Sequence, residues 1–258
     1  MRAAIASVTV EDVKAFHRKN YGPAQMTIVV TGDIDAKTAR AAIERAFAGW
    51  SGGREYARAT HARATVPNYE QAITLTDKAS VNVFWGQATG VRLADPDFLP
   101  LDIAANVLGS GFTGRLMGSV RVKEGLTYGI GADLFGSDVT DGGLFVQCTF
   151  APALLDKGVA STCREVERWW KDGVTAEELA ARKDSLIGNQ RLALGSTYGI
   201  GQALLATIVR GLDPAWFDAY PERVRAVTLD QVNGAIRKYV DPQKLVMVKA
   251  GTFAEPAR

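Results

Sequence analysis

The sequence has few of the residues that build metal centres or disulfides. Its 258 residues include two histidines, His17 and His61, and two cysteines, Cys148 and Cys163. The histidines are too far apart to share one helical turn, and neither H-E-x-x-H nor H-x-x-E-H can be written anywhere in the chain. We therefore expect no cofactor or metal in this chain, and no disulfide framework.

Signatures of phosphate, membrane and nucleic-acid binding are also missing. The chain has no G-x-x-x-x-G-K-[ST] phosphate loop. No apolar run approaches the roughly 20 residues that cross a bilayer. Thirty Lys and Arg against 28 Asp and Glu leave a net charge of +2, without the basic excess typical of nucleic-acid binding. We expect no membrane span and no nucleic-acid partner, and we infer that the chain lacks a complete catalytic centre.

What the sequence does contain is an imperfect internal repeat. Residues 8–34 align with residues 227–253 without gaps, and eight of the 27 positions are identical. Each copy reads as a helix, a proline turn and a strand. So long an offset between the copies indicates duplicated domains and not a solenoid.

The two copies carry the same local signals. Thr9 and Thr228 are candidate N-caps, and the side chains three positions later, Asp12 and Gln231, complete a capping box. Each helix then meets a proline, at positions 23 and 242, which cannot continue it. We expect strands to follow at residues 26–30 and 245–248. The first of them has lost at least one pairing neighbour, so it must find another or stay frayed.

The repeat predicts the domain organisation. A domain's length of chain precedes the second copy, whereas seven residues precede the first. Residues 1–48, with a further helix at 36–47, are therefore expected to be the tail of a preceding homologous domain, and the chain the carboxy-terminal part of a longer protein. Residues 49–70 read as a linker, in which Arg54, Arg58 and Arg63 are either solvated or in contact with an acidic partner. Residues 71–258 are expected to form a complete domain.

The order of elements in residues 71–258 predicts an α+β fold. Strands are indicated at 71–76, 81–89, 128–135 and 144–150, and the last two form a hairpin through a turn at 141–143. Helices are expected at 97–108, 113–123, 155–172 and 175–194, the last one opened by a capping box of Thr175 and Glu178. Strands first, then helices, then one closing strand indicate a mainly antiparallel sheet backed by helices.

Residues with reactive or bulky side chains are interpreted as structural. Cys148 alternates with apolar residues along one strand face, and both thiols are expected in the core. His17 is expected on an amphipathic helix, and Trp169 is expected to pack and not to bind a ligand. The apolar stripe of the helix at 155–172 is expected to comprise Leu155, Val159, Cys163, Val166 and Trp170.

A glycine-rich segment follows the helix at 97–108. Gly109, Gly111 and Gly114 spell G-x-G-x-x-G, but the dinucleotide fingerprint must follow a strand, and this segment follows a helix. Two interpretations remain. The segment is a helix-to-helix turn in which glycine supplies a positive φ, or it is a loop that lets the backbone of a ligand come close.

Arg121 and Tyr128 follow this segment. Arg121 lies on the short helix, Gly125 breaks that helix, and Tyr128 begins a strand, so the two side chains can converge on one spot. A permanent guanidinium charge and a phenol donor suit a peptide carbonyl whose oxygen gains negative charge. The alternative is structural: a salt bridge from Arg121 to Glu124 and a half-buried strand tyrosine.

A family resemblance rests first on residues 109–132. They read GSGFTGRLMGSVRVKEGLTYGIGA, which resembles the signature of the second half of the pitrilysin/insulinase-like (inverzincin) zinc metallopeptidases. The repeated segments resemble the ends of that family's repeated domains. Residues 81–108 and the segment WWKDGVTAEEL at 169–179 resemble other stretches of the family. The likeness covers nearly the whole chain except the linker.

The resemblance implies a processing-peptidase-like (LuxS-like) domain in a clam-shell of two halves. The amino-terminal half carries H-x-x-E-H and zinc, and the carboxy-terminal half supplies an arginine and a tyrosine across the cleft. That catalytic pair falls on Arg121 and Tyr128, and the substrate-binding loop on Gly109, Gly111 and Phe112. By resemblance this chain is the zinc-free half, which is inactive alone and helps to form a closed chamber. Its expected partners are a zinc-bearing half, on the same polypeptide or as a separate subunit, and a peptide substrate.

The family also implies an alternative. Members that lost the zinc motif resemble non-catalytic scaffolds or partner subunits, whereas an H-x-x-E-H upstream in the same polypeptide would favour the protease. Related bacterial proteins are often exported, so the resemblance implies a bacterial periplasmic location.

Overall fold

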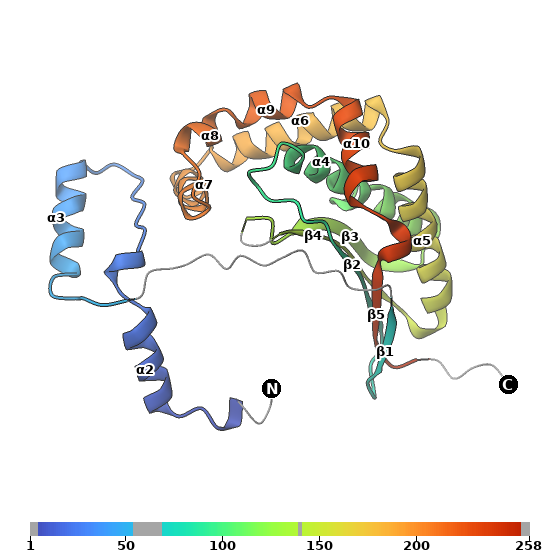
Figure 1. The fold of residues 1–258 in the computed structure, drawn as a ribbon, viewed down its shortest axis with the longest axis horizontal. Coiled ribbons are helices and arrows are strands. Elements are labelled where there is room, and N and C mark those ends of the chain that lie inside the picture. Colours follow the sequence, from blue (N-terminus) through green and yellow to red (C-terminus); the bar gives the residue numbers. More distant parts are fainter. Residues whose placement is uncertain (1–4, 54–68, 139–140, 254–258) are drawn as a thin grey trace. The chain divides into compact units, whose positions relative to one another are not determined.

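The computed structural model describes residues 5–53, 69–138 and 141–253 (Figure 1). The chain forms two compact units, one made of Met1–Arg58 and Asn189–Ala219, the other of Ala59–Gly188 and Tyr220–Arg258. Most of the expected linker, with its three arginines and His61, lies outside the described residues. The division into residues 1–48, 49–70 and 71–258 stays a prediction.

The larger unit is built on one five-stranded sheet. Its strands are β1 (Glu70–Thr74), β2 (Val81–Ala88), β3 (Thr127–Phe135), β4 (Gly143–Phe150) and β5 (Val246–Gly251), in the spatial order β1-β5-β2-β4-β3. Only β1 and β5 run parallel, and the pairs β5–β2, β2–β4 and β4–β3 are antiparallel. The predicted α+β class, the mainly antiparallel sheet and the β3–β4 hairpin are confirmed.

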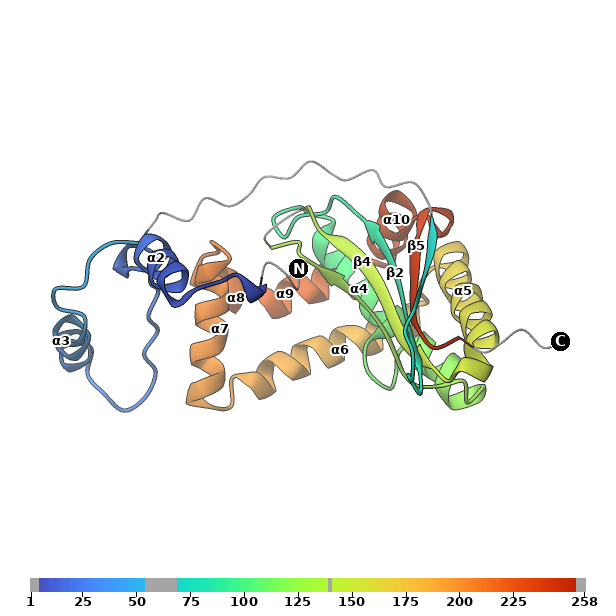
Figure 2. The ribbon, with the colours of Figure 1, turned by 90° about the horizontal axis from the view of Figure 1, so that it is seen from below.

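One face of this sheet is buried and the other is open. In β4, Leu144, Val146, Cys148 and Phe150 are buried while the residues between them are not. This period of two places alternate side chains on opposite faces of the sheet. In Figures 1 and 2 the helices α4 (Phe98–Gly109), α5 (Leu155–Asp172) and α10 (Leu229–Tyr239) cover the buried face. α9 (Tyr220–Ala226) also belongs to the larger unit, and α6 (Ala176–Ala193) begins in the larger unit and ends in the smaller one.

The buried stripe of α5 is shifted from the predicted one. Trp169 is fully buried and donates its indole N–H to the carbonyl of Ala104 at 3.1 Å, whereas Trp170 is half-buried and bonds to the carbonyl of Val240. Val159 and Cys163 are likewise only partly buried. Leu155 and Val166 were placed correctly, but the helix is rotated so that Trp169 lies at the centre of its buried face. Gly173 ends the helix with a φ of 76°, as expected.

The repeat is confirmed at the level of local structure. α2 (Val10–Asn20) corresponds residue for residue to α10, and both begin with the predicted capping box. Short 3₁₀ turns follow in both copies, at Pro23–Gln25 and Pro242–Lys244. The second copy continues into β5, but the strand predicted at residues 26–30 is wrong. Within the described residues no neighbouring strand pairs with this segment, and Ile28 and Val30 remain exposed.

The smaller unit consists of helices and connecting segments. It contains α2, α3 (Ala36–Ala46), α7 (Thr197–Val209) and α8 (Pro214–Asp218). The helix predicted at 36–47 is confirmed as α3, and Asp35 caps it by accepting from the backbone N–H of Thr38. The hydroxyl of Thr31 donates to the carbonyl of Thr197 at 2.8 Å, which joins the extended segment to α7.

Neither α2 nor α3 contains a buried residue. Among the described helices, none taken singly has the length and apolar composition of a membrane span; taken together, the consecutive but bent pair α6 and α7 does.

Candidate functional site

The glycine segment holds α4 against the edge strand β3. A Cβ on Gly109 would lie 2.0 Å from the backbone nitrogen of Ala132, so only glycine allows this approach. Gly111 has a φ of +63°, in the left-handed region that favours glycine. The segment therefore turns from α4 toward the next helical element, and it does not follow a strand. Its expected role in substrate binding stays a prediction.

The next element is a π-helix, η2 (Met117–Lys123), where an ordinary short helix was expected. The wide turn is visible at its end, where the backbone N–H of Glu124 donates to the carbonyl of Ser119, five residues earlier, at 3.0 Å. Gly125, with a φ of 65°, ends the element as predicted. Short π segments are rare and are found disproportionately at functional sites. Here the segment carries Arg121.

Tyr128 projects from a β-bulge at the start of β3. The pairing of β3 with β4 shifts between Thr127 and Ile130, so Tyr128 and Gly129 fall outside the regular ladder. The hydroxyl of Thr127 takes the place of ladder hydrogen bonds at the bulge. It donates to the carbonyl of Thr149 at 2.6 Å and accepts from the backbone N–H of Gly129 at 3.2 Å. Bulges commonly redirect a side chain next to a site. Tyr128 is 86% exposed.

The two elements bring Arg121 and Tyr128 into contact. The guanidinium carbon of Arg121 lies 4.6 Å from the centre of the Tyr128 ring and 5.0 Å from the centre of the Phe112 ring. Both distances are within the range of cation–π attraction. Phe112, which was named separately as part of the glycine segment, therefore joins the predicted pair Arg121 and Tyr128 in one group on the larger unit, which we call the Arg121 cluster.

The structural alternative for this pair is wrong. The carboxylate of Glu124 accepts from Ser161 and from Arg164, both at 2.8 Å, and not from Arg121. In the part of the chain that the structure describes, no carboxylate lies within ion-pair distance of Arg121. Tyr128 is exposed and not half-buried. Among the described residues the charge of the partly buried Arg121 therefore has no carboxylate partner, and the phenol of Tyr128 is exposed.

A hollow of about 500 Å³ adjoins the Arg121 cluster. It lies over the edge of the open sheet face, and Gly111 and Gly129, the chain neighbours of Phe112 and Tyr128, line it. Gly109 lines it as well. The remaining lining residues are Asn82, Phe84, Met117, Ile130, Gly131, Gln147, Cys148 and Thr149.

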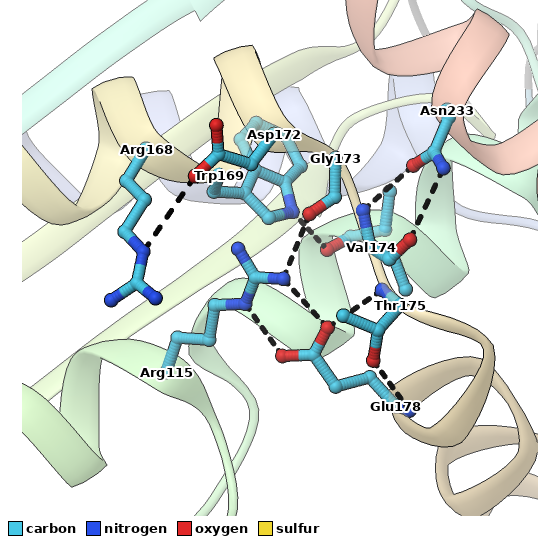
Figure 3. A network of polar contacts seen from close by, with 10 residues as sticks. Arg115, Arg168, Trp169, Asp172, Gly173, Val174, Thr175, Glu178 and Asn233 are labelled. Atoms are coloured by element: carbon cyan, nitrogen blue, oxygen red, sulfur yellow. Dashed lines mark hydrogen bonds and ion pairs between the residues drawn. The ribbon is translucent and has the colours of Figure 1, made fainter.

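A polar network ties the segment just before η2, the element that carries Arg121, to the start of α6 (Figure 3). Arg115, at the start of the turn into η2, donates two bonds of 2.6 Å to the carboxylate of Glu178 and a third to the carbonyl of Gly173. Glu178 also closes the predicted capping box with Thr175. Burial alone would raise the pKa of the Glu178 carboxyl, but the hydrogen bonds from Arg115 and Thr175 outweigh it and the pKa is lowered.

A second arginine supports the glycine segment. Arg182 of α6 is buried and lies 3.4 Å from the carbonyl of Ser110 and 3.2 Å from the hydroxyl of Thr113. Burial lowers the pKa of its guanidinium. Sequence reasoning identified neither Arg115 nor Arg182. The available signal for Arg115 was its position directly after Gly114, whereas nothing local marks Arg182.

Other reactive residues lie away from the cluster or in the core. Cys148 is buried as expected, Cys163 is only partly buried, and burial raises the pKa of both thiols. His17 is exposed and stacks on Tyr21 with ring centres 5.2 Å apart. The described residues contain no group of three His, Cys, Asp or Glu side chains that could hold a metal ion.

One further sequence motif, at residues 49–53, is typical of hydrolases but lies in a different structural setting here. Residues 49–53, GWSGG, spell G-x-S-x-G, which in hydrolases places a nucleophilic serine on a sharp turn between a strand and a helix. Here the motif follows the helix α3, and residues 5–48, which the structure describes, contain no strand. Ser51 therefore does not sit on a nucleophile elbow.

These features define the class of protein. An α+β unit with an open sheet face, a glycine turn, and a partly buried arginine in contact with an exposed tyrosine matches the expected zinc-free half of a metallopeptidase. The family model described as "Peptidase M16 inactive domain" matches residues 7–186, which is more than half of the chain. The chain belongs to this family, and the predicted resemblance is confirmed.

Three relatives place the chain within the family. It is 24% identical over 240 residues to an uncharacterized zinc protease of Streptomyces coelicolor, covering 90% of this chain and 51% of that protein. It is 23% identical over 193 residues to the non-peptidase homolog YmxG of Helicobacter pylori, covering 74% and 44%. It thus spans about half the length of the curated relatives it matches. A crystal structure of a peptidase M16 inactive domain from Pseudomonas fluorescens shares the fold, with a TM-score of 0.84, 24% identity, and 98% and 59% of the two chains covered.

Proposed function

We propose that this chain is the zinc-free half of a metallopeptidase and binds peptide substrate next to the scissile bond. The observation that carries the proposal is the contact of Arg121 with the exposed Tyr128, without a carboxylate to neutralise the arginine among the described residues. A scaffold has no need for an unpaired charge and an exposed phenol held together by a π-helix and a bulge.

The two side chains have complementary roles in the proposal. Tyr128 donates its phenol hydrogen to the carbonyl oxygen of the scissile peptide as that oxygen gains negative charge. Arg121 is a fixed planar donor with a permanent charge, so it orients the substrate carbonyls or a neighbouring carboxylate. The glycine segment, with Gly109, Gly111 and Phe112, borders the space where the substrate backbone lies.

The metal belongs to the other half in this proposal. The described residues offer no set of metal ligands, so zinc does not fit here, and this chain is inactive by itself. A zinc-bearing half, on the same polypeptide or separate, closes against it to form the chamber. Residues 1–48 then form the end of a preceding homologous domain, residues 49–70 the linker, and residues 71–258 the inactive domain.

A second candidate function is a non-catalytic partner subunit. It is favoured by one observation, that a relative of similar identity is named a non-peptidase homolog. The two functions differ in one assay. This chain is mixed with a zinc-bearing half from the same source and tested on a quenched peptide: cleavage that requires both halves supports the peptidase, and binding without cleavage supports the partner subunit.

The role of Tyr128 is tested by Tyr128→Phe in the enzyme formed with the zinc-bearing half. Loss of one donor to an oxyanion typically lowers turnover by about 100-fold to 1000-fold, and we expect such a drop with unchanged zinc content. Tyr198→Phe is the matched control, because Tyr198 is also exposed but lies on α7, outside the cluster. Near-normal turnover of Tyr128→Phe would refute the role.

A further inference from the structure

The hollow beside the Arg121 cluster exists because β3 lacks side chains where it borders the open sheet face. Gly129 and Gly131 both line it. A Cβ built on Gly129 meets nothing within 4 Å, and Gly129 has an ordinary φ. The position therefore does not require glycine for its backbone or for close packing. The space that glycine leaves there is open.

The floor of the hollow is formed by paired residues of the open face. Asn82 pairs with Thr149 and Phe84 with Gln147 in the β2–β4 ladder, so these four side chains form a compact block. The hydroxyl of Thr149 donates to the side-chain oxygen of Asn82 at 2.8 Å. Phe84 is 46% exposed, so its ring offers apolar surface at the floor of the hollow.

The hollow is uncharged throughout. None of its lining side chains carries a formal charge, and Asp133, on the same side of β3, is not one of them. An ionised side chain that entered would lose water without gaining a counter-ion, which is costly. An uncharged side chain would instead cover Phe84 and find hydrogen-bonding groups on Asn82, Gln147 and Thr149. The hollow, with a volume of about 500 Å³, has ample room for a large side chain.

We infer that this hollow is a specificity subsite that receives a bulky, uncharged side chain of an extended peptide whose backbone passes the Arg121 cluster. The inference rests on the proposed function, because the peptide is the same one that Arg121 and Tyr128 contact. Gly129 and Gln147 are its specificity-determining residues. Gly129 leaves the space open, and Gln147 keeps its floor polar but uncharged.

The test measures binding and needs no catalysis. Fluorescein-labelled heptapeptides with blocked ends, identical except for Phe, Gln, Glu or Lys at the centre, are titrated with this chain and followed by anisotropy. We expect the Phe and Gln peptides to bind at least about tenfold more tightly than the Glu and Lys peptides. Gln and Glu have nearly the same size, so their difference isolates the charge.

Two variants locate the effect. Gly129→Val fills the hollow at an unstrained position and is expected to weaken the Phe peptide about tenfold. Gly234→Ala, on α10 and also in open space, is the control and leaves binding unchanged. Gln147→Glu places a charge in the floor at an exposed strand position and is expected to shift the preference toward Lys; it tests the subsite even if Gly129→Val does not fold.

The possible failures are distinguishable. If no peptide binds, both the proposed function and the subsite are overturned. If peptides bind and Arg121→Ala weakens them, but the central residue, Gly129→Val and Gln147→Glu have no effect, the subsite alone is overturned. Equal or tighter binding of the Glu peptide would also overturn it, because it would show that Arg121 governs selection at this position.

Discussion

The guanidinium of Arg121 stacks on the ring of Tyr128, 4.6 Å from its centre, although the residues belong to different elements. A π turn, a glycine in the left-handed region and a β-bulge lie between or beside them. Each of these departures from regular geometry redirects the chain locally. Their combined effect is to place a charge and a hydrogen-bond donor side by side on the surface.

The first prediction concerns Arg121→Lys. A cation–π contact at a partly exposed site contributes about 1 kcal/mol, so the free energy of unfolding should change by about that amount or less. Turnover of the enzyme formed with the zinc-bearing half should fall about tenfold or more, because lysine lacks the planar fork of donors. Urea unfolding and a peptidase assay measure the two effects. Arg164→Lys is the control, because Arg164 is an exposed arginine paired with Glu124. This substitution should change neither the free energy of unfolding nor the turnover strongly.

The second prediction concerns the hydroxyl of Thr127, which holds the bulge. Thr127→Val keeps the shape but leaves the carbonyl of Thr149 and the N–H of Gly129 without this partner. We expect the free energy of unfolding to fall by about 1–3 kcal/mol and kcat to fall while zinc content is unchanged. Thr127→Ser restores the hydroxyl and should recover both. If Thr127→Val keeps wild-type kcat, Thr127 does not position Tyr128.

The third prediction uses the repeat as its own control. Thr9 and Thr228 cap α2 and α10 in the same way, but α10 buries Val232, Ala235 and Ile236 while α2 buries nothing. Thr228→Ala should lower the stability of the larger unit by about 1 kcal/mol. Thr9→Ala should leave that transition unchanged. Denaturation followed by tryptophan fluorescence measures both, and equal losses would contradict the expectation.

The fourth prediction concerns acid. The pKa of Glu178 is lowered in the folded chain, so its contribution to stability is present above its unfolded pKa, near 4.5, and is lost as the pH falls through the lower folded value. At pH 7, Glu178→Gln should lower the free energy of unfolding by about 1–2 kcal/mol, because it weakens the bonds from Arg115. The difference from wild type should shrink below pH 4.5.

Urea unfolding at several pH values tests this prediction. Glu177→Gln, one position earlier and exposed on the same helical turn, is the control. A constant difference between Glu178→Gln and wild type from pH 7 to pH 3 would show that the ionised carboxylate is not what stabilises the contact.

Features set by neighbouring residues were the ones that could be predicted. The capping boxes of Thr9, Thr228 and Thr175 depend on contacts three positions apart, and all three form. The alternation in β4 follows from the period of a strand, and it placed Cys148 correctly. The rotation of α5, which buries Trp169 more deeply than Trp170, depends on what the helix packs against, and the stripe alone did not reveal it.

The candidate site was predicted only in part. Arg121, Tyr128 and Phe112 could be named from the order of residues, since a helix, a glycine and a strand start were readable. Their contact depends on a π-helix and a bulge, which have no reliable sequence signal. The supporting residues Arg115 and Arg182 reach partners more than 60 positions away, and no local pattern specifies such pairs.

By itself the sequence determined where helices begin and end, which strands alternate, and to which family the chain belongs, because these depend on nearby side chains and on recurring order. Only the tertiary structure decided that residues 246–251 form a strand while the matching residues 27–32 do not. It alone also brought Arg121 onto Tyr128 and opened a hollow beside them. The physical reason is the same in each case: a strand needs a neighbour, and a site needs side chains from separate elements, and both are supplied by distant parts of the chain.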